Sequence, residues 1–302
     1  MPCAPRRRFS IEASLTATLA ALCCLSIAKA DPPPTPAEAE SSPVLPEVAA
    51  EPAHAALERR VEIFIRALTR NPGAPDDYSA VRWNTPICIL VAGLSAVSAS
   101  TVSDRVSQIS SAAGAPLARA PCQPNFIIVA TADPDQILDA WYARDKGLFG
   151  DATPAQIHQF VETSRPWPVR VWYNIDRGRK AGMRNGHFVP STTQADSSVF
   201  LGNAVFDFSS VFAIIDTHRT EHAALKQLAD YVAMTGLTDV DFAADLGGAP
   251  SILRLFSPPQ NGGPSGLSNW DSAFLKALYQ SNQASRTQRF EIEQRVNQEI
   301  LR

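Results

Sequence analysis

A chain of 302 residues, of which 45% are hydrophobic and 19% charged, is long enough to bury a substantial core. Its net charge of −3 makes it mildly acidic, so it is not expected to bind nucleic acid, whose phosphates attract basic surfaces. No apolar run after residue 30 approaches the length that spans a membrane, so no transmembrane helix is expected in the mature protein.

The first thirty residues have the three parts of an export signal. Residues 6 to 8 are arginines, residues 15 to 27 form an apolar run, and the segment closes on the small residues Ala28 and Ala30. The apolar run is too short to span a membrane comfortably. We therefore predict a signal peptide over residues 1–30, cleavage after Ala30, and export to the periplasm or the medium.

Two other kinds of export signal fit the segment less well. The arginines followed by Phe9 loosely fit the twin-arginine pattern, but Ser10 stands where an apolar residue is usual. Cys23 and Cys24 would indicate a lipoprotein, but Leu22 stands where a small residue must precede the lipid-modified cysteine. Ordinary secretion is favoured. Losing the signal, with its four basic residues and one acidic residue, takes the net charge from −3 to −6.

Only two cysteines, Cys88 and Cys122, remain once the signal is removed. In an oxidising compartment such a pair predicts a disulfide. A thiol nucleophile would need a neighbouring histidine and a metal pair would need CxxC spacing, and neither cysteine has one. On the chain-entropy model the bond would stabilise the fold by roughly 3 to 4 kcal/mol.

The segment after the signal is dominated by proline, alanine, glutamate and serine. It reads DPPPTPAEAESSPVLPEVAA over residues 31 to 50. Such a composition buries too little apolar surface to offset its ordering entropy, and repeated proline keeps it extended. We predict a disordered tether over residues 31–53 and one globular domain over residues 54–302.

The globular part alternates between helical and strand periodicity. Strands are expected over residues 86–92, 125–132, 169–175 and 206–215. Between them, helices are expected over residues 56–70 and 100–113, from Pro134 after the cap Asp133, and from the capping box of Thr153 and Gln156. The last third is helical, over residues 221–234, 271–280 and 286–301. This order predicts an α/β to α+β domain with a helical C-terminal portion.

The final hundred residues also carry a resemblance. An apolar strand (VFAIID), a helix (QLADYVAMTGL), a short apolar segment (SILRLF) and a further helix (GLSNWDSAFLKALYQS) follow one another in that order. This order resembles an uncharacterised family of secreted bacterial proteins related to zincin metallopeptidases. The resemblance implies a zincin-like mixed sheet with packed helices. Zincins hold zinc with the two histidines of HExxH on a helix that ends near Gly-Leu.

The resemblance implies a lost zinc site. With Gly236-Leu237 as the anchor, Ala229 and Ala233 stand where the two histidines would be, and Asp230 stands in place of the glutamate. Alanine offers no lone pair to a metal, so the scaffold would be kept without its catalyst. A pseudoenzyme of this kind, with no cofactor, is expected to bind a protein, a peptide or an envelope ligand, although fold alone does not supply a function.

A second motif favours the opposite conclusion. His218, Glu221 and His222 form HxxEH, the inverted zincin signature, in which the histidines hold zinc and the glutamate acts as base. This hypothesis makes the protein a zinc-dependent hydrolase. However, Thr220 is an N-cap candidate, so the helix can begin after His218, and the helical spacing of the two histidines would then be lost.

Two further features have alternative interpretations. Gln227 and Asp230 either line the relic cleft of the lost metal site or hold their helix to a neighbouring loop. The run from Pro166 to Tyr173 (PWPVRVWY) is either a recognition edge for a peptide or glycan, or an edge strand whose aromatic residues pack inward, which is favoured. The sequence thus predicts an exported, non-catalytic binding or envelope-associated protein, with the zinc hydrolase as the alternative.

Overall fold

A computed structural model describes residues 50–69, 80–177, 183–184, 187–188, 206–257, 263–283, 285 and 287–302. The expected signal peptide and the tether up to residue 49 lie outside the described residues. The first described helix, α1 (Ala50–Thr69), begins at Ala50, so the last residues of the range expected for the tether are helical.

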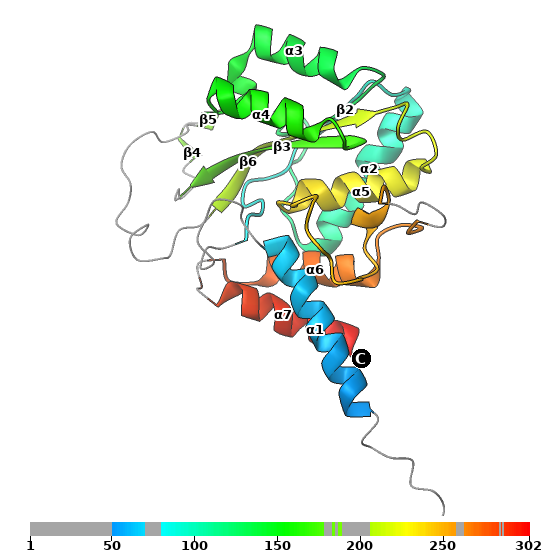
Figure 1. The fold of residues 1–302 in the computed structure, drawn as a ribbon. Helices are drawn as coiled ribbons and strands as arrows, with labels where there is room; N and C mark the ends of the chain where they lie inside the picture. The colour runs from blue at the N-terminus through cyan, green and yellow to red at the C-terminus, as the bar shows by residue number, and fades with distance from the viewer. Residues whose placement is uncertain are drawn as a thin grey trace, which may run out of the picture. The chain divides into compact units, whose positions relative to one another are not determined.

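The described residues form a mixed α/β fold, as the alternating periodicity predicts (Figure 1). A four-stranded sheet has the order β1-β2-β6-β3. The strands β1 (Ile89–Ala92), β2 (Phe126–Thr131) and β6 (Phe206–Asp216) run parallel, and β3 (Val169–Arg177) is antiparallel to β6 at the edge. A separate short pair joins β4 (Met183–Arg184) to β5 (His187–Phe188).

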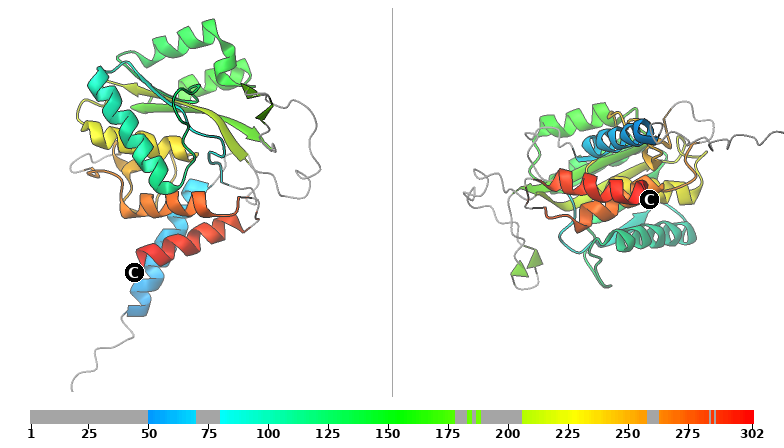
Figure 2. Two further views of the ribbon diagram at one scale, coloured as in Figure 1. Left: turned by 180° about the vertical axis from the view of Figure 1, so that it is seen from behind. Right: turned by 90° about the horizontal axis from the view of Figure 1, so that it is seen from below.

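Helices cover both faces of the sheet (Figures 1 and 2). On one face lie α2 (Ala96–Ala113) and α5 (Leu225–Leu237), and on the other lie α3 (Pro134–Arg144) and α4 (Pro154–Ser164). A further layer below α2 and α5 holds α1, α6 (Asn269–Gln280) and α7 (Gln288–Ile300). Two short 3-10 helices, η2 (Lys146–Phe149) and η3 (Ile252–Arg254), lie in the connections.

Several predicted caps are present. Asp133 accepts a hydrogen bond from Gln136 N and is followed by Pro134, whose fixed backbone suits the first helical position. The capping box of Thr153 and Gln156 opens α4 as expected. Ser268 and Asp271 form a further capping box at α6. These local hydrogen bonds satisfy backbone N–H groups that the first helical turn leaves without intrahelical partners.

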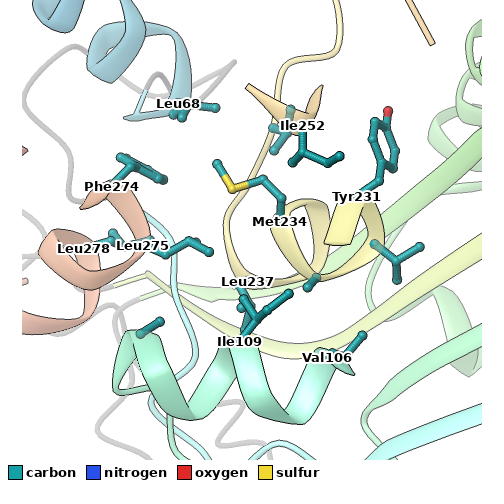
Figure 3. Close-up of a cluster of buried hydrophobic side chains, with 14 of the residues drawn as sticks. Leu68, Val106, Ile109, Tyr231, Met234, Leu237, Ile252, Phe274, Leu275 and Leu278 are labelled. Atoms are coloured by element: carbon teal, nitrogen blue, oxygen red, sulfur yellow. The ribbon is translucent and has the colours of Figure 1, made fainter. Parts of the chain in front are cut away.

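The main core lies between the sheet and the helices on the α2 and α5 face, and α5 is at its centre (Figure 3). Met234 and Leu237 are fully buried there, among side chains of α2 and α6. Every residue of this helix from Leu228 to Leu237 is buried, because α2, α6 and η3 surround the sides of the helix that the sheet does not cover.

The two expected disulfide partners are joined. Cys88 precedes β1 and Cys122 precedes β2, and their sulfur atoms are bonded with a Cα–Cα distance of 6.0 Å. The bond therefore ties together the entries of two neighbouring parallel strands. Among the described residues, no helix combines the length and the apolar composition needed to cross a bilayer.

Candidate functional site

The positions that correspond to a zincin zinc site lie inside the core. Ala229 and Ala233 in α5 are both 0% exposed, packed among apolar side chains. Tyr231 and Val232 between them are buried as well. These positions therefore contribute methyl groups to the packing of α5, and neither carries a metal-ligating atom.

Asp230, the position that corresponds to the zincin glutamate, is held in an ion pair. Its carboxylate accepts hydrogen bonds from the Arg105 guanidinium in α2 at 2.5 and 3.3 Å, and from Leu267 N at 2.9 Å. Lys226 Nζ lies 3.4 Å away. Burial by itself raises the pKa of Asp230, but the hydrogen bonds and the two cations outweigh it and hold the pKa below its ordinary value.

Gln227 also connects α5 to the segment that precedes α6. Its side-chain oxygen accepts a hydrogen bond from Ala224 N, and its side-chain nitrogen donates to the carbonyl oxygen of Pro264 at 2.8 Å. Together with the bond from Asp230 to Leu267 N, this attaches the helix to residues 263–267. The contacts correspond to the second of the two interpretations drawn from the sequence, in which these polar groups hold the helix to a neighbouring loop.

The HxxEH residues do not have the geometry of an inverted zinc motif. Helix α5 begins at Leu225 rather than near Glu221, and the segment from Thr217 to Ala223 is a series of turns. Asp216 Oδ1 organises these turns by accepting hydrogen bonds from the backbone N–H of His218 at 3.0 Å and of Arg219 at 3.1 Å. His218 and His222 are therefore not one helical turn apart on one face.

The surroundings of these histidines are those of an exposed turn. The side chain of His222 is 85% exposed and lies 3.4 Å from Glu221. Within the described part of the chain, no group of three or more His, Cys, Asp or Glu side chains is placed to hold a metal ion.

The aromatic residues of β3 and its entry divide between the two faces of the sheet. Trp172 packs against Phe149 and Phe160, with ring centroids 5.3 and 5.0 Å away. Tyr173 stacks on Phe208 on the opposite face, at 5.4 Å. These contacts follow from the alternation of side chains along a strand, and they correspond to an edge strand with aromatic residues packed inward.

Trp167, just before β3, instead lines a small surface hollow. Phe242 lies against it with ring centroids 5.6 Å apart. Tyr231 of α5 and Phe256 after η3 form a second aromatic pair in the same lining, edge to face, with ring centroids 5.0 Å apart. Tyr231 is buried and the other three rings are half-buried, so the hollow has an aromatic lining that reaches the surface.

Acidic residues accompany these rings. Asp241 is the one charged residue among the described residues that line the hollow, and its Oδ1 accepts a hydrogen bond from Ala243 N at 2.9 Å. Asp239 lies two residues earlier. Burial raises the pKa of Asp239 to about 7, with a further contribution from the negative charge of Asp241.

A further carboxyl group with a shifted pKa, that of Asp207, lies at the start of β6. Asp207 lies opposite Asp176 in the antiparallel pair of β3 and β6, and the side-chain amide of Asn84 donates a hydrogen bond to it. Burial raises the pKa of Asp207 to about 6, against the effect of that hydrogen bond and of Arg82. Asn84 also binds Gln283, so this group ties the sheet to the segment between α6 and α7.

The hollow is the feature that sequence analysis missed. Of its aromatic lining, only Trp167 falls within the PWPVRVWY run. Asp241 and Phe242 lie in a segment without periodicity, and nothing in the sequence indicates that it meets Trp167. Arg105 was likewise inconspicuous, because one arginine on an amphipathic helix normally points to solvent.

The described residues define a protein of the mixed α/β class with a small aromatic and acidic hollow. Comparison with protein families, with characterised proteins and with solved structures finds no match to this chain.

Proposed function

We propose that this is an exported protein that binds a ligand without turning it over, on a scaffold related to the zincin metallopeptidases. The observation that carries the proposal is the state of the two positions that correspond to the zinc ligands. Ala229 and Ala233 are fully buried methyl groups, and Asp230 between them is committed to Arg105. Helix α5 therefore contributes to the core and contributes no reactive group to a cleft.

The aromatic hollow is the proposed binding site. Aromatic rings at a concave surface give a ligand a large apolar contact area at a low cost in side-chain entropy, and few polar groups suffice to orient it. Trp167, Phe242 and Phe256 meet this description, because each is half-buried and held by an aromatic neighbour.

Export is supported by the sequence of residues 1–30 and by the Cys88–Cys122 bond. A disulfide forms and persists in the periplasm or outside the cell, whereas cytosolic thiols are kept reduced. The N-terminal residue of the protein purified from the periplasm tests this part. Cleavage after Ala30 is expected, and a purified protein that still carries residues 1–30 would contradict this prediction.

Metal content separates a binding protein from the zinc hydrolase. Mature protein without a His-tag is analysed for zinc, beside a His218→Ala, His222→Ala variant and a His158→Ala control, which removes an exposed histidine of α4. We expect no stoichiometric zinc in any of the three. Zinc that is lost only from the double variant would establish HxxEH as a site and overturn the proposal.

Ligand-detected NMR with a library of small fragments tests the binding site. Fragments that bind the mature protein are expected not to bind the Phe242→Leu variant, in which a smaller side chain replaces one ring of the lining. The same fragments are expected to bind the Phe160→Leu variant. Phe160 is a matched control, since it is also half-buried and aromatic but packs on Trp172 on the other face of the sheet. Fragments that are indifferent to Phe242→Leu would place the binding site elsewhere.

A further inference from the structure

We propose that the aromatic hollow recognises a quaternary ammonium group of the choline type. This inference rests on the proposed function, and it names the chemical class of the ligand. The hollow pairs aromatic rings with one acid. A cation near the face of an aromatic ring is attracted by the ring quadrupole, and the attraction strengthens where water is excluded. Trp167, Tyr231, Phe242 and Phe256 supply the rings, and Asp241 supplies the negative charge.

The hollow carries uncompensated negative charge. The described lining residues include no arginine or lysine, so the charge of Asp241 is not neutralised within the hollow. Asp239, two residues earlier, adds a second carboxyl, whose pKa is raised mainly by burial and further by repulsion from Asp241. A bound cation would relieve this repulsion, and a bound anion would increase it.

Hydrogen-bonding capacity distinguishes a quaternary ammonium from the cations of lysine and arginine. A lysine ammonium carries three hydrogen-bond donors and a guanidinium carries five. Besides Asp241, which already accepts a hydrogen bond from Ala243 N, the side-chain acceptors in the described lining are the hydroxyls of Ser257 and Tyr231. A trimethylammonium group donates no hydrogen bond, so it can lie against aromatic and aliphatic walls and be neutralised by one carboxylate.

The chain contains a matched control for the acid. Asp241 and Asp245 lie in the same segment, and each accepts a hydrogen bond from the backbone N–H two residues later, Ala243 and Gly247 respectively, both at 2.9 Å. Only Asp241 is among the residues that line the hollow. Changing either residue to asparagine keeps the accepting oxygen and removes one negative charge, so the two variants differ in whether the charge faces the ligand.

The test uses the tryptophan side-chain N–H signals of the mature protein in ¹H–¹⁵N NMR spectra. Five tryptophans give five signals, and Trp167→Phe assigns the one in the hollow. Choline and its neutral isostere 3,3-dimethyl-1-butanol are titrated into wild type, Asp241→Asn and Asp245→Asn. We expect choline to shift the Trp167 signal and leave the other four tryptophan signals in place. The dissociation constant for choline is expected to rise about tenfold in Asp241→Asn, which corresponds to 1.4 kcal/mol, and to stay unchanged in Asp245→Asn.

The outcomes separate the two proposals. If the neutral isostere binds as tightly as choline, or if both asparagine variants behave alike, the hollow is an apolar site and the ammonium inference is wrong while the binding function stands. If neither compound moves the Trp167 signal, the ammonium inference is also wrong, and the fragment screen with Phe242→Leu decides the binding function by itself. Should Asp241→Asn fail to fold, the preference of wild type for choline over its isostere remains decisive.

The ammonium group can come from a soluble molecule or from a lipid head group. Sedimentation with phosphatidylcholine vesicles, compared with phosphatidylglycerol vesicles, distinguishes these sources. Binding to free choline without cosedimentation identifies a soluble ligand. Cosedimentation with phosphatidylcholine alone that is lost in Asp241→Asn identifies the head group.

Discussion

The ring of Phe126 in β2 lies directly against the backbone of Gly236 in α5, so that a Cβ built on Gly236 would meet Cζ of Phe126 at 1.9 Å. Both residues are buried in the main core. The carbonyl oxygen of Gly236 also accepts a hydrogen bond from Nε1 of Trp83 at 2.8 Å. The absence of a side chain at this position lets the central helix approach the sheet closely.

Gly236→Ala is therefore expected to destabilise the protein. On helix propensity alone, alanine would stabilise α5 by about 1 kcal/mol. Overpacking against the buried ring of Phe126 costs about 1 to 3 kcal/mol, and the backbone shift strains the Trp83 hydrogen bond as well. Urea unfolding measures the net effect, and a gain in stability would show that the helix shifts freely away from the sheet.

A double-mutant cycle tests the cause. Phe126→Leu alone should destabilise by creating a cavity, but in combination with Gly236→Ala the shorter side chain should accommodate the new methyl group. We expect the two changes together to cost less than the sum of their separate costs. Strict additivity would mean that the cost of Gly236→Ala arises elsewhere.

Removal of the buried carboxylate at Asp230 is expected to lower the free energy of unfolding strongly. Asp230→Ala leaves Arg105, whose side chain is 24% exposed, without its acidic partner, and breaking a buried ion pair in this way costs up to about 3 kcal/mol where one partner reaches solvent. Asp104→Ala is the matched control on α2, because that exposed carboxylate only accepts a hydrogen bond from Ser100. Its effect should stay within about 0.5 kcal/mol. Similar losses of stability for both variants would contradict the structural role of the pair.

The pair also predicts a pH dependence. Because the pKa of Asp230 is lower in the folded state than in the unfolded state, its contribution to stability is present above its unfolded pKa and is lost as the pH falls through its folded pKa. Wild type should thus lose stability at acid pH more steeply than an Asp230→Asn, Arg105→Met variant, which lacks both charges. Equal acid sensitivity in the two proteins would count against this assignment.

Asp239 should act in the opposite direction. Its folded pKa of about 7 lies above its ordinary value, so the folded state keeps a proton that the unfolded state has lost. The stability associated with Asp239 is present below its unfolded pKa and falls as the pH rises toward about 7. Asp239→Asn, which stays neutral, should gain stability relative to wild type between pH 5 and pH 8. Thermal unfolding at both pH values measures this gain, and a difference that does not change with pH would refute it.

The disulfide is expected to contribute roughly 3 to 4 kcal/mol, given the sequence separation of 34 between its cysteines. A Cys88→Ser, Cys122→Ser variant should lose this stability at every pH, and dithiothreitol should lower the stability of wild type to the level of the variant. The variant itself should not respond to the reductant. If wild type does not respond either, the two cysteines are not bonded in the protein.

The sequence by itself determined those parts of the fold that depend on neighbours in the chain. The period of apolar residues located the helices and the strands of the sheet, and the short-range hydrogen bonds of Asp133 and Thr153 located two helix starts. The interleaved order of strands and helices was enough for the mixed α/β class. The pairing of Cys88 with Cys122 followed by elimination, since the other three cysteines fall in the expected signal.

The tertiary structure decided what depends on contacts between distant segments. The start of α5 at Leu225 is one example, because Asp216 organises turns over the residues where the sequence also permitted a helix, and this removed the spacing of His218 and His222. The ion pair of Asp230 with Arg105 joins residues 125 positions apart. The hollow in which Trp167 meets Phe242 is another case, since no periodicity links a strand entry to an irregular segment that follows a later helix.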